Sequence, residues 1–75
     1  MVKVVFDYSN LRGEMAKQKI TREKLAKLTG IGITTITTHL KHGTKFDTEQ
    51  AVMIARALGL TSMDDYFFIY KLQNS

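Results

Sequence analysis

The 75-residue sequence lacks cysteine and proline, and it has no long hydrophobic run. Without cysteine, the chain can form neither disulfides nor thiolate metal sites, and nothing indicates an oxidising compartment. The longest apolar run, Tyr66–Tyr70, is far shorter than the ~20 residues that span a membrane, and no signal peptide is recognisable. No proline, repeat or low-complexity linker divides the chain. We therefore expect one domain over residues 1–75, located in the cytoplasm and without a membrane partner.

Acidic residues are scarce in the first 45 residues, which carry nine Lys or Arg against three Asp or Glu. Residues 46–75 carry two basic and four acidic side chains. The net charge of +4 is therefore unevenly distributed, with the positive charge concentrated in the N-terminal part. A positive surface attracts the phosphates of nucleic acid. A solvated basic surface would give the same count, so charge alone leaves both interpretations open.

The chain also has few of the residue arrangements that support catalysis or cofactor binding. Asp64 and Asp65 are adjacent at a predicted helix start, where they suit the helix dipole rather than an acid/base pair. His39 and His42 lie three residues apart, but no cysteine or acidic residue nearby completes a metal site. The glycines mark turns, and no phosphate-binding loop follows a strand. We therefore expect no enzyme activity, no cofactor, no metal and no small-molecule substrate.

Residues 21–43 contain two short helical patterns joined by a Gly-containing turn. Thr21 can cap the first helix, and Gly30 suits the left-handed backbone that often ends a helix. The residues predicted to face inward in this helix are Leu25, Ala26 and Leu28. This is the layout of a helix-turn-helix (residues 21–43), which places its second helix in the DNA major groove.

The second helical pattern runs from about Gly32 to residue 41 or 42 and ends at Gly43. Ile36 and Leu40 lie four residues apart, which places both on one buried face of a helix. The β-branched run ITTITT within this segment also permits a strand. The flanking glycines and the Ile36–Leu40 spacing favour the helix.

With Ile36 and Leu40 inward, the second helix would expose a threonine-rich face. On a helical wheel the outward residues are Thr34, Thr38 and Lys41, with Thr35 and Thr37 at the flanks. Threonine can hydrogen-bond a base edge, its methyl group can contact the thymine methyl, and lysine can reach phosphate or guanine. The face lacks Arg, Asn and Gln, which make bidentate base contacts, so some specificity would come from DNA shape.

The sequence before this unit predicts a further helix. Residues 1–6 (MVKVVF) predict a strand or a hydrophobic arm, and Asp7 or Ser9 can cap the helix that follows. The residues predicted to face inward in that helix are Tyr8, Leu11 and Met15.

The sequence after this unit predicts two helices and an ambiguous end. Asp47 with Gln50 predicts a capping box for a fourth helix that ends at Gly59. The residues predicted on its buried face are Ala51, Ile54, Ala55 and Leu58. Ser62 with Asp65 repeats the capping pattern and opens a short fifth helix. The segment YFFIYKL permits a continued helix or a strand paired with residues 2–6. The predicted fold class is therefore all-α, with five helices and, where the ends are extended, a short terminal β-ribbon.

Several motifs in a fixed order carry a family resemblance over about residues 6–68. They are Phe-x-Tyr-Ser-x-Leu-Arg-Gly from Phe6, Leu-Lys-x-Gly from Leu40, Phe46 before the fourth helix, Leu58-Gly59 at its end, and Tyr-Phe-Phe from Tyr66. The chain thereby resembles the lambda-repressor-like helix-turn-helix family, the Cro and CI type of phage and bacterial regulators, and within it the small phage repressor-like proteins. Gly32 departs from the family, because many relatives have a Ser or Thr cap there.

The resemblance implies a sequence-specific DNA-binding transcriptional regulator that inserts residues 32–42 into the major groove of an operator. The residues implied at the DNA are Arg22 on the backbone and Gly32, Ile33, Thr34, Thr37, Thr38 and Lys41 at the groove, with Lys45 beside them. Double-stranded operator DNA is therefore the expected partner.

A recognition helix with few base-reading groups needs a second copy on a dyad-symmetric operator, so we expect a homodimer. The expected contact residues are Tyr66, Phe68 and Tyr70, because this aromatic run exceeds what a 75-residue core needs. An alternative interpretation is an antitoxin or antirepressor that uses the same scaffold to bind another protein through these aromatic residues. Salt dependence separates the two, since DNA affinity falls steeply with salt.

Overall fold

The computed structural model describes residues 1–74. Over this range the chain forms five helices and two strands, in the order β1 (Val2–Phe6), α1 (Ser9–Lys17), α2 (Arg22–Thr29), α3 (Ile33–His42), α4 (Thr48–Leu58), α5 (Asp64–Phe67) and β2 (Tyr70–Asn74). The predicted five-helix, all-α fold is confirmed, and residues 2–6 form a strand. The ambiguous segment YFFIYKL is divided, because Tyr66 and Phe67 end α5 whereas Tyr70 begins β2.

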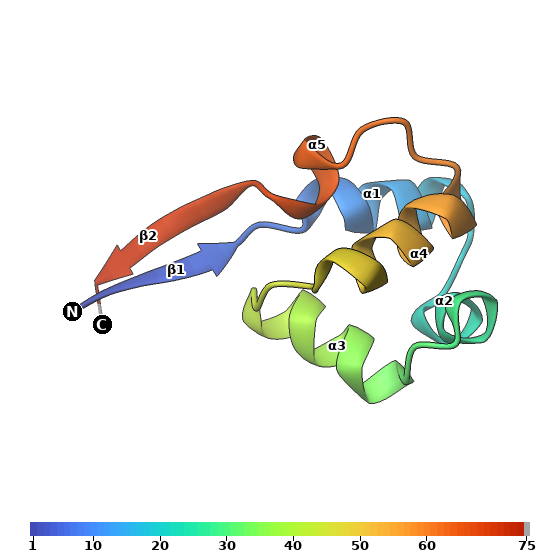
Figure 1. Cartoon of the computed structure of the whole chain (residues 1–75), viewed down its shortest axis with the longest axis horizontal. Helices are drawn as coiled ribbons and strands as arrows, with labels where there is room; N and C mark the ends of the chain where they lie inside the picture. The colour runs from blue at the N-terminus through green and yellow to red at the C-terminus, as the bar shows by residue number, and fades with distance from the viewer. Residues whose placement is uncertain (75) are drawn as a thin grey trace.

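The five helices gather into one body, and the two strands form a ribbon that extends away from it (Figure 1). The beginning of β1 and the end of β2 lie together at the far tip of the ribbon. At the ribbon's base, the amide of Phe6 donates to the carbonyl of Gly43 over 2.8 Å, and the amide of Asp7 donates to the carbonyl of Ile69 over 2.8 Å. The first bond ties the base of the ribbon to the end of α3, and the second joins the segments on either side of the ribbon's base.

The strands β1 and β2 pair antiparallel, with Val2 opposite Asn74 and Phe6 opposite Tyr70. Side chains alternate between the two faces of a strand, and directly opposite residues share a face. One face therefore carries Val2, Val4, Phe6, Tyr70 and Leu72, with Asn74 at its end. The other face carries Lys3, Val5, Lys71 and Gln73. The ribbon is thus apolar on one side and mostly polar on the other.

The hydrophobic core lies among the helices of the body. Its most deeply buried side chains are Tyr8, Leu11, Leu25, Ile36, Phe46, Ile54 and Phe67. The ring of Phe46 makes edge contacts with Tyr8 and Phe67, at centroid distances of 5.2 and 5.9 Å. The loop after α3 is thereby anchored between α1 and α5. The predicted inward residues of α1, α3 and α4 are all buried.

Most of the predicted helix boundaries are confirmed by specific hydrogen bonds or backbone angles. The Thr21 hydroxyl accepts from the Lys24 amide over 3.1 Å at the start of α2. Asp47 and Gln50 form the predicted capping box at the start of α4. The glycines that end α2, α3 and α4 have positive φ, at 78°, 67° and 66° for Gly30, Gly43 and Gly59. Residues with a side chain resist this conformation.

Three predictions about residue placement are wrong. Leu28 is 53% exposed rather than inward, because α2 is a short helix whose buried side centres on Leu25. Ser62 does not cap α5, since that helix begins at Asp64 with Met63 as its N-cap and has no side-chain cap. Neither Asp7 nor Ser9 caps α1, because Tyr8 occupies the N-cap position without a side-chain cap, and Asp7 accepts hydrogen bonds from Ser9 instead. The sequence patterns predicted the helices correctly but misplaced these side chains.

Candidate nucleic-acid interface

The turn between α2 and α3 is held by side-chain and backbone bonds within a few residues. The Thr29 hydroxyl donates to the Leu25 carbonyl over 2.7 Å and accepts from the Ile31 amide over 3.2 Å. Gly30 supplies the left-handed residue, and Ile31 is buried beneath the turn. With Leu25, Ile36 and Ile31 in the core, the relative orientation of α2 and α3 is set by packing.

The solvent side of α3 carries most of the residues predicted to meet DNA. Thr34, Thr38 and Lys41 are exposed, Ile33 is 41% exposed, and Thr37 is half-buried at the flank. Ile36 and Leu40 are buried on the opposite side. α3 therefore presents hydroxyl groups, methyl groups and one cation to the solvent, with no charged residue of opposite sign on the helix.

Gly32 precedes α3 as its N-cap, with φ −60° and ψ 139°, an extended conformation that any residue can adopt. No side chain caps this helix start. A Cβ at Gly32 would meet only the Thr35 hydroxyl, at 3.9 Å, so neither the backbone nor the packing requires glycine here. A Ser or Thr cap would fit the same position.

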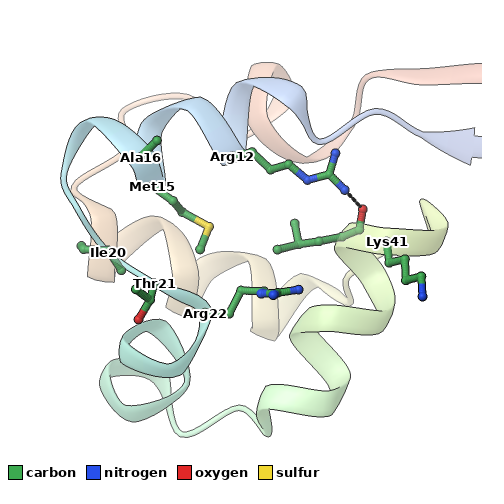
Figure 2. Close-up of a pocket in the computed structure, with 8 residues that line it drawn as sticks. Arg12, Met15, Ala16, Ile20, Thr21, Arg22 and Lys41 are labelled. Carbon is green, nitrogen blue, oxygen red and sulfur yellow. Dashed lines mark hydrogen bonds between the residues drawn. The ribbon is translucent and has the colours of Figure 1, made fainter.

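A groove runs between α1, α2 and α3, beside the exposed side of α3 (Figure 2). Three cations border it, namely Arg12 from α1, Arg22 from α2 and Lys41 from α3, while Met15 and Ile20 give it an apolar lining. The three positive charges come from three separate helices, so the fold creates this concentration of charge. A phosphate backbone that passes α3 would meet favourable potential here.

Arg12 was not among the residues that the sequence identified as part of the site. Its guanidinium donates to the carbonyl of Leu40 near the end of α3, as the dashed line in Figure 2 shows. A cation is favourable at this end of a helix, because the last carbonyls carry partial negative charge. Its only sequence signal was its place in the motif that begins at Phe6, which says nothing about contact with α3.

The other predicted residues lie outside α3. The Lys45 ammonium lies 5.8 Å from the centroid of the Phe68 ring, in cation–π range. Tyr66 and Phe68 are half-buried and pack against the core, whereas Tyr70 is 58% exposed on the ribbon. The three aromatic residues predicted as a dimer contact thus divide between the body and the ribbon.

Neither histidine belongs to a cluster of metal ligands. His39 Nδ1 and the Thr44 hydroxyl oxygen lie 2.5 Å apart in a hydrogen bond. The His39 ring packs on the Phe46 ring, with 4.6 Å between the ring centroids. Within residues 1–74, no group of three or more His, Cys, Asp or Glu side chains is arranged to hold a metal ion. His39 instead helps to fix the loop that follows α3.

The Tyr8 hydroxyl joins α1 to the same loop. It donates to the Thr44 carbonyl over 2.6 Å and accepts from the Phe46 amide over 3.3 Å. Burial raises the pKa of the Tyr8 hydroxyl above its ordinary value of 10.0, because the charged form would lose its hydration. Tyr8 therefore acts as a neutral structural anchor beneath the C-terminal end of α3.

This helix-turn-helix, with a cationic groove beside its second helix, defines a small DNA-binding protein. The family model of the Cro/C1-type HTH DNA-binding domain matches residues 10–66, which is most of the chain. The chain belongs to this family of DNA-binding regulators, as the sequence motifs predicted. No curated protein matches the chain. Among the helices of residues 1–74, none has the length and hydropathy needed to cross a membrane.

Proposed function

We propose that the chain is a sequence-specific transcriptional repressor of the phage Cro/CI type, acting as one DNA-binding domain over residues 1–75. Its helix α3 would enter the major groove of an operator and exclude the transcription machinery. The observation that carries this proposal is the two-sided character of α3. Ile36 and Leu40 fix the helix in the core, while Thr34, Thr38 and Lys41 are exposed beside a groove bordered by further cations.

The exposed residues of α3 can make a limited number of sequence-specific contacts with the bases. The hydroxyls of Thr34 and Thr38 can donate to or accept from base edges, and the exposed methyls of Ile33 can contact a thymine methyl. Thr37, at the flank, can contribute its methyl group to the same contact. With no Arg, Asn or Gln on this helix, discrimination at several operator positions would depend on DNA shape.

Contacts to the sugar-phosphate backbone would come from Arg22, Arg12 and Lys41 around the groove, with Lys45 in the following loop. These cations bind every sequence alike, and they set the position of α3 on the duplex. Arg12 would act in two ways, since it also holds the end of α3 through the Leu40 carbonyl.

A regulator with this few base contacts would work as two copies on a dyad-symmetric operator. Half-sites read by paired helix-turn-helix units lie about 34 Å apart, one turn of the DNA helix. Cooperation between two half-sites multiplies the discrimination that one α3 supplies. Of the three residues predicted to contact a second copy, Tyr66, Phe68 and Tyr70, the most exposed is Tyr70.

The test is a mobility-shift assay on DNA from upstream of the protein's own gene, over a salt series. We expect affinity to fall steeply as salt rises, and Arg22→Ala or Lys41→Ala should lower the salt slope by about one unit. Arg56→Ala is the matched control, since Arg56 is exposed on α4, away from the groove. An affinity that does not change with salt would contradict DNA binding and favour the protein-binding alternative.

Base readout is tested separately from charge. Thr34→Ala and Thr38→Ala should each cost about 1–3 kcal/mol on the preferred operator and change which base pairs are tolerated, with little loss on random DNA. Thr61→Ala removes an equivalent exposed threonine outside the helix-turn-helix and should change neither. Equal losses on operator and random DNA would show that these threonines do not read sequence.

A further inference from the structure

The groove between α1, α2 and α3 has an apolar lining that contacts with phosphate do not require. Met15 and Leu40 are each 6% exposed and form its floor, and Ile20 is half-buried beside them. The groove has a volume of about 590 Å³, within the ~300–1,000 Å³ range of small-molecule sites. A DNA phosphate presents only polar oxygens, so it would pair with the cations at the rim and leave the apolar floor uncovered.

Two guanidinium groups border this floor from opposite sides (Figure 2). Arg12 reaches the groove from α1 and Arg22 from α2, and Lys41 lies beside them on α3. In the described part of the chain, neither Arg22 nor Lys41 has an ion pair or a side-chain hydrogen bond. Arg12 uses one donor on the Leu40 carbonyl and keeps others, since a guanidinium has five N–H donors. No Asp or Glu lines the groove, so its three positive charges are uncompensated.

We propose that this groove binds a small organic anion, a carboxylate with a compact acyl or aryl body, and that the bound anion lowers the affinity of the chain for DNA. The planar fork of a guanidinium matches the two oxygens of a carboxylate. The apolar body would cover the exposed parts of Met15 and Ile20. Binding of the anion is independent of the proposed function, whereas its effect on DNA rests on that function.

Charge and apolar surface together select this class of ligand. An inorganic anion would leave the apolar floor exposed, and a neutral apolar molecule would leave both guanidinium groups without an acceptor. An organic cation would be repelled by the three positive charges. The lining also contains no His or Cys, and the Thr21 hydroxyl already accepts from the Lys24 amide at the start of α2. We therefore expect the anion to bind and dissociate unchanged.

A bound anion would act on DNA binding because it uses the same cations. Arg22 and Lys41 are the proposed contacts to phosphate, and a carboxylate in the groove would neutralise part of their charge. Loss of positive charge at a phosphate contact weakens binding to every DNA sequence alike. Coupling between two ligands is reciprocal, so DNA should weaken binding of the anion by the same factor.

The first experiment follows the backbone amides of the isotope-labelled chain by NMR while octanoate is added without DNA. Acetate supplies the charge without the apolar body, and octanol supplies the apolar body without the charge. Octanoate should shift the amides of Ala16, Ile20 and Lys41 to saturation, and bind on the order of tenfold more tightly than either control. The exposed apolar residues Val4 and Leu72 on the ribbon report non-specific contact. Equal affinity for octanol, or shifts confined to the ribbon, would overturn the site.

Two pairs of variants test which residues hold the anion, all at exposed positions where the fold should tolerate them. Arg22→Ala removes a guanidinium from the groove, whereas Arg56→Ala removes one beside another apolar pocket, between α2 and α4. Arg22→Ala should weaken octanoate binding by on the order of tenfold, and Arg56→Ala should leave it unchanged. Ala16→Glu should also weaken it by repulsion, whereas Thr61→Glu adds the same charge outside the groove. Equal effects within either pair would overturn the assignment.

The effect on DNA is scored separately, by mobility shift at constant ionic strength. Saturating octanoate should lower the DNA affinity of the wild type by on the order of tenfold relative to the same concentration of acetate. Octanoate that occupies the groove without lowering this affinity would overturn the effect on DNA. A wild type that binds octanoate in the groove but no DNA would overturn the proposed function and leave the anion site intact. DNA binding without octanoate binding would overturn the anion site and leave the proposed function intact.

Discussion

Two segments rich in β-branched residues fold in opposite ways in this protein. Residues 33–38 read ITTITT and form the first turns of α3, whereas residues 2–6 read VKVVF and form β1. The intrinsic preference of β-branched residues for β-structure would put both segments into strands. The difference shows that the contacts of each segment, with the core for α3 and with β2 for β1, decide the structure at these positions, rather than the preference of individual residues.

The two segments differ in the period with which their apolar side chains share a face. In α3, Ile36 and Leu40 are buried four residues apart, and glycines stand on both sides of the helix. In β1, Val2 and Val4 share one face of the ribbon, and Val5 turns to the other. A four-residue period fits one side of a helix and a two-residue period fits one side of a strand.

The largest expected effect tests whether burial holds α3 as a helix. Ile36 is fully buried, so Ile36→Ala should lower the free energy of unfolding by about 4 kcal/mol, through lost contacts and the cavity that remains. Ile33→Ala is the matched control in the same helix. Since Ile33 is 41% exposed, its loss should change stability by less than about 0.5 kcal/mol while weakening operator binding. Urea unfolding measures both, and similar losses would contradict the buried-face explanation.

The next effect lies where α3 meets the ribbon. A Cβ at Gly43 would overlap the Val5 side chain and come within 2.8 Å of the Phe6 carbonyl oxygen. Gly43→Ala should cost about 3 kcal/mol, the sum of a left-handed backbone penalty and overpacking. Gly59→Ala has the same backbone angle but open space around it, so it should cost only about 1–2 kcal/mol. Equal losses at the two glycines would mean that close approach to β1 is unimportant.

Much of this arrangement could be predicted from the sequence, because many of the signals are local. Thr21, the Asp47–Gln50 pair and the three helix-ending glycines act on residues within one helical turn. The four buried residues of α4 follow its helical period. Even the ribbon could be anticipated, since the apolar segments at the two ends of the chain had only each other as strand partners.

What the sequence could not predict depends on contacts between distant segments. Leu28 has the right spacing for a buried face, but it lies at a surface pocket beside Met53 and Ala57 of α4 and stays 53% exposed. The contact between Arg12 and the Leu40 carbonyl joins residues 28 positions apart, and no sequence pattern encodes it. The apolar face of the ribbon could be predicted only from the strand register, because a shift of one residue would exchange the two faces of a strand.

A smaller effect tests how the loop after α3 is anchored. Tyr8→Phe removes the hydroxyl that bonds the Thr44 carbonyl and the Phe46 amide, so it should cost about 1–2 kcal/mol. Because burial raises the pKa of Tyr8, the folded state keeps its proton where the unfolded chain loses it. The stability that Tyr8 provides is therefore fully present below pH 10 and falls as pH rises beyond it. Tyr70→Phe, on the exposed ribbon, is the control, and an equal alkaline loss in Tyr8→Phe and wild type would contradict this assignment.

The smallest effect concerns Asp7, which lies between β1 and α1. Its carboxylate accepts from the Ser9 hydroxyl over 2.5 Å and from the Ser9 amide over 2.9 Å, and Lys71 Nζ lies 4.0 Å away. These contacts, chiefly the hydroxyl bond, hold the pKa of Asp7 below its ordinary value of 3.8. The stability it provides should therefore be present above pH 3.8 and be lost as pH falls through the lowered pKa.

Asp7→Asn keeps a side-chain acceptor at this position but removes the charge, so it should abolish this part of the acid dependence at little cost at neutral pH. Urea midpoints measured between neutral and acid pH report the difference. Lys71→Ala separates the helix start from the ribbon, because it removes only an exposed ion pair of small value. If Lys71→Ala removes the acid dependence as fully as Asp7→Asn does, the charge of Asp7 acts mainly through Lys71 on the ribbon. If the acid dependence remains in Lys71→Ala, the charge acts mainly through the Ser9 bonds at the start of α1.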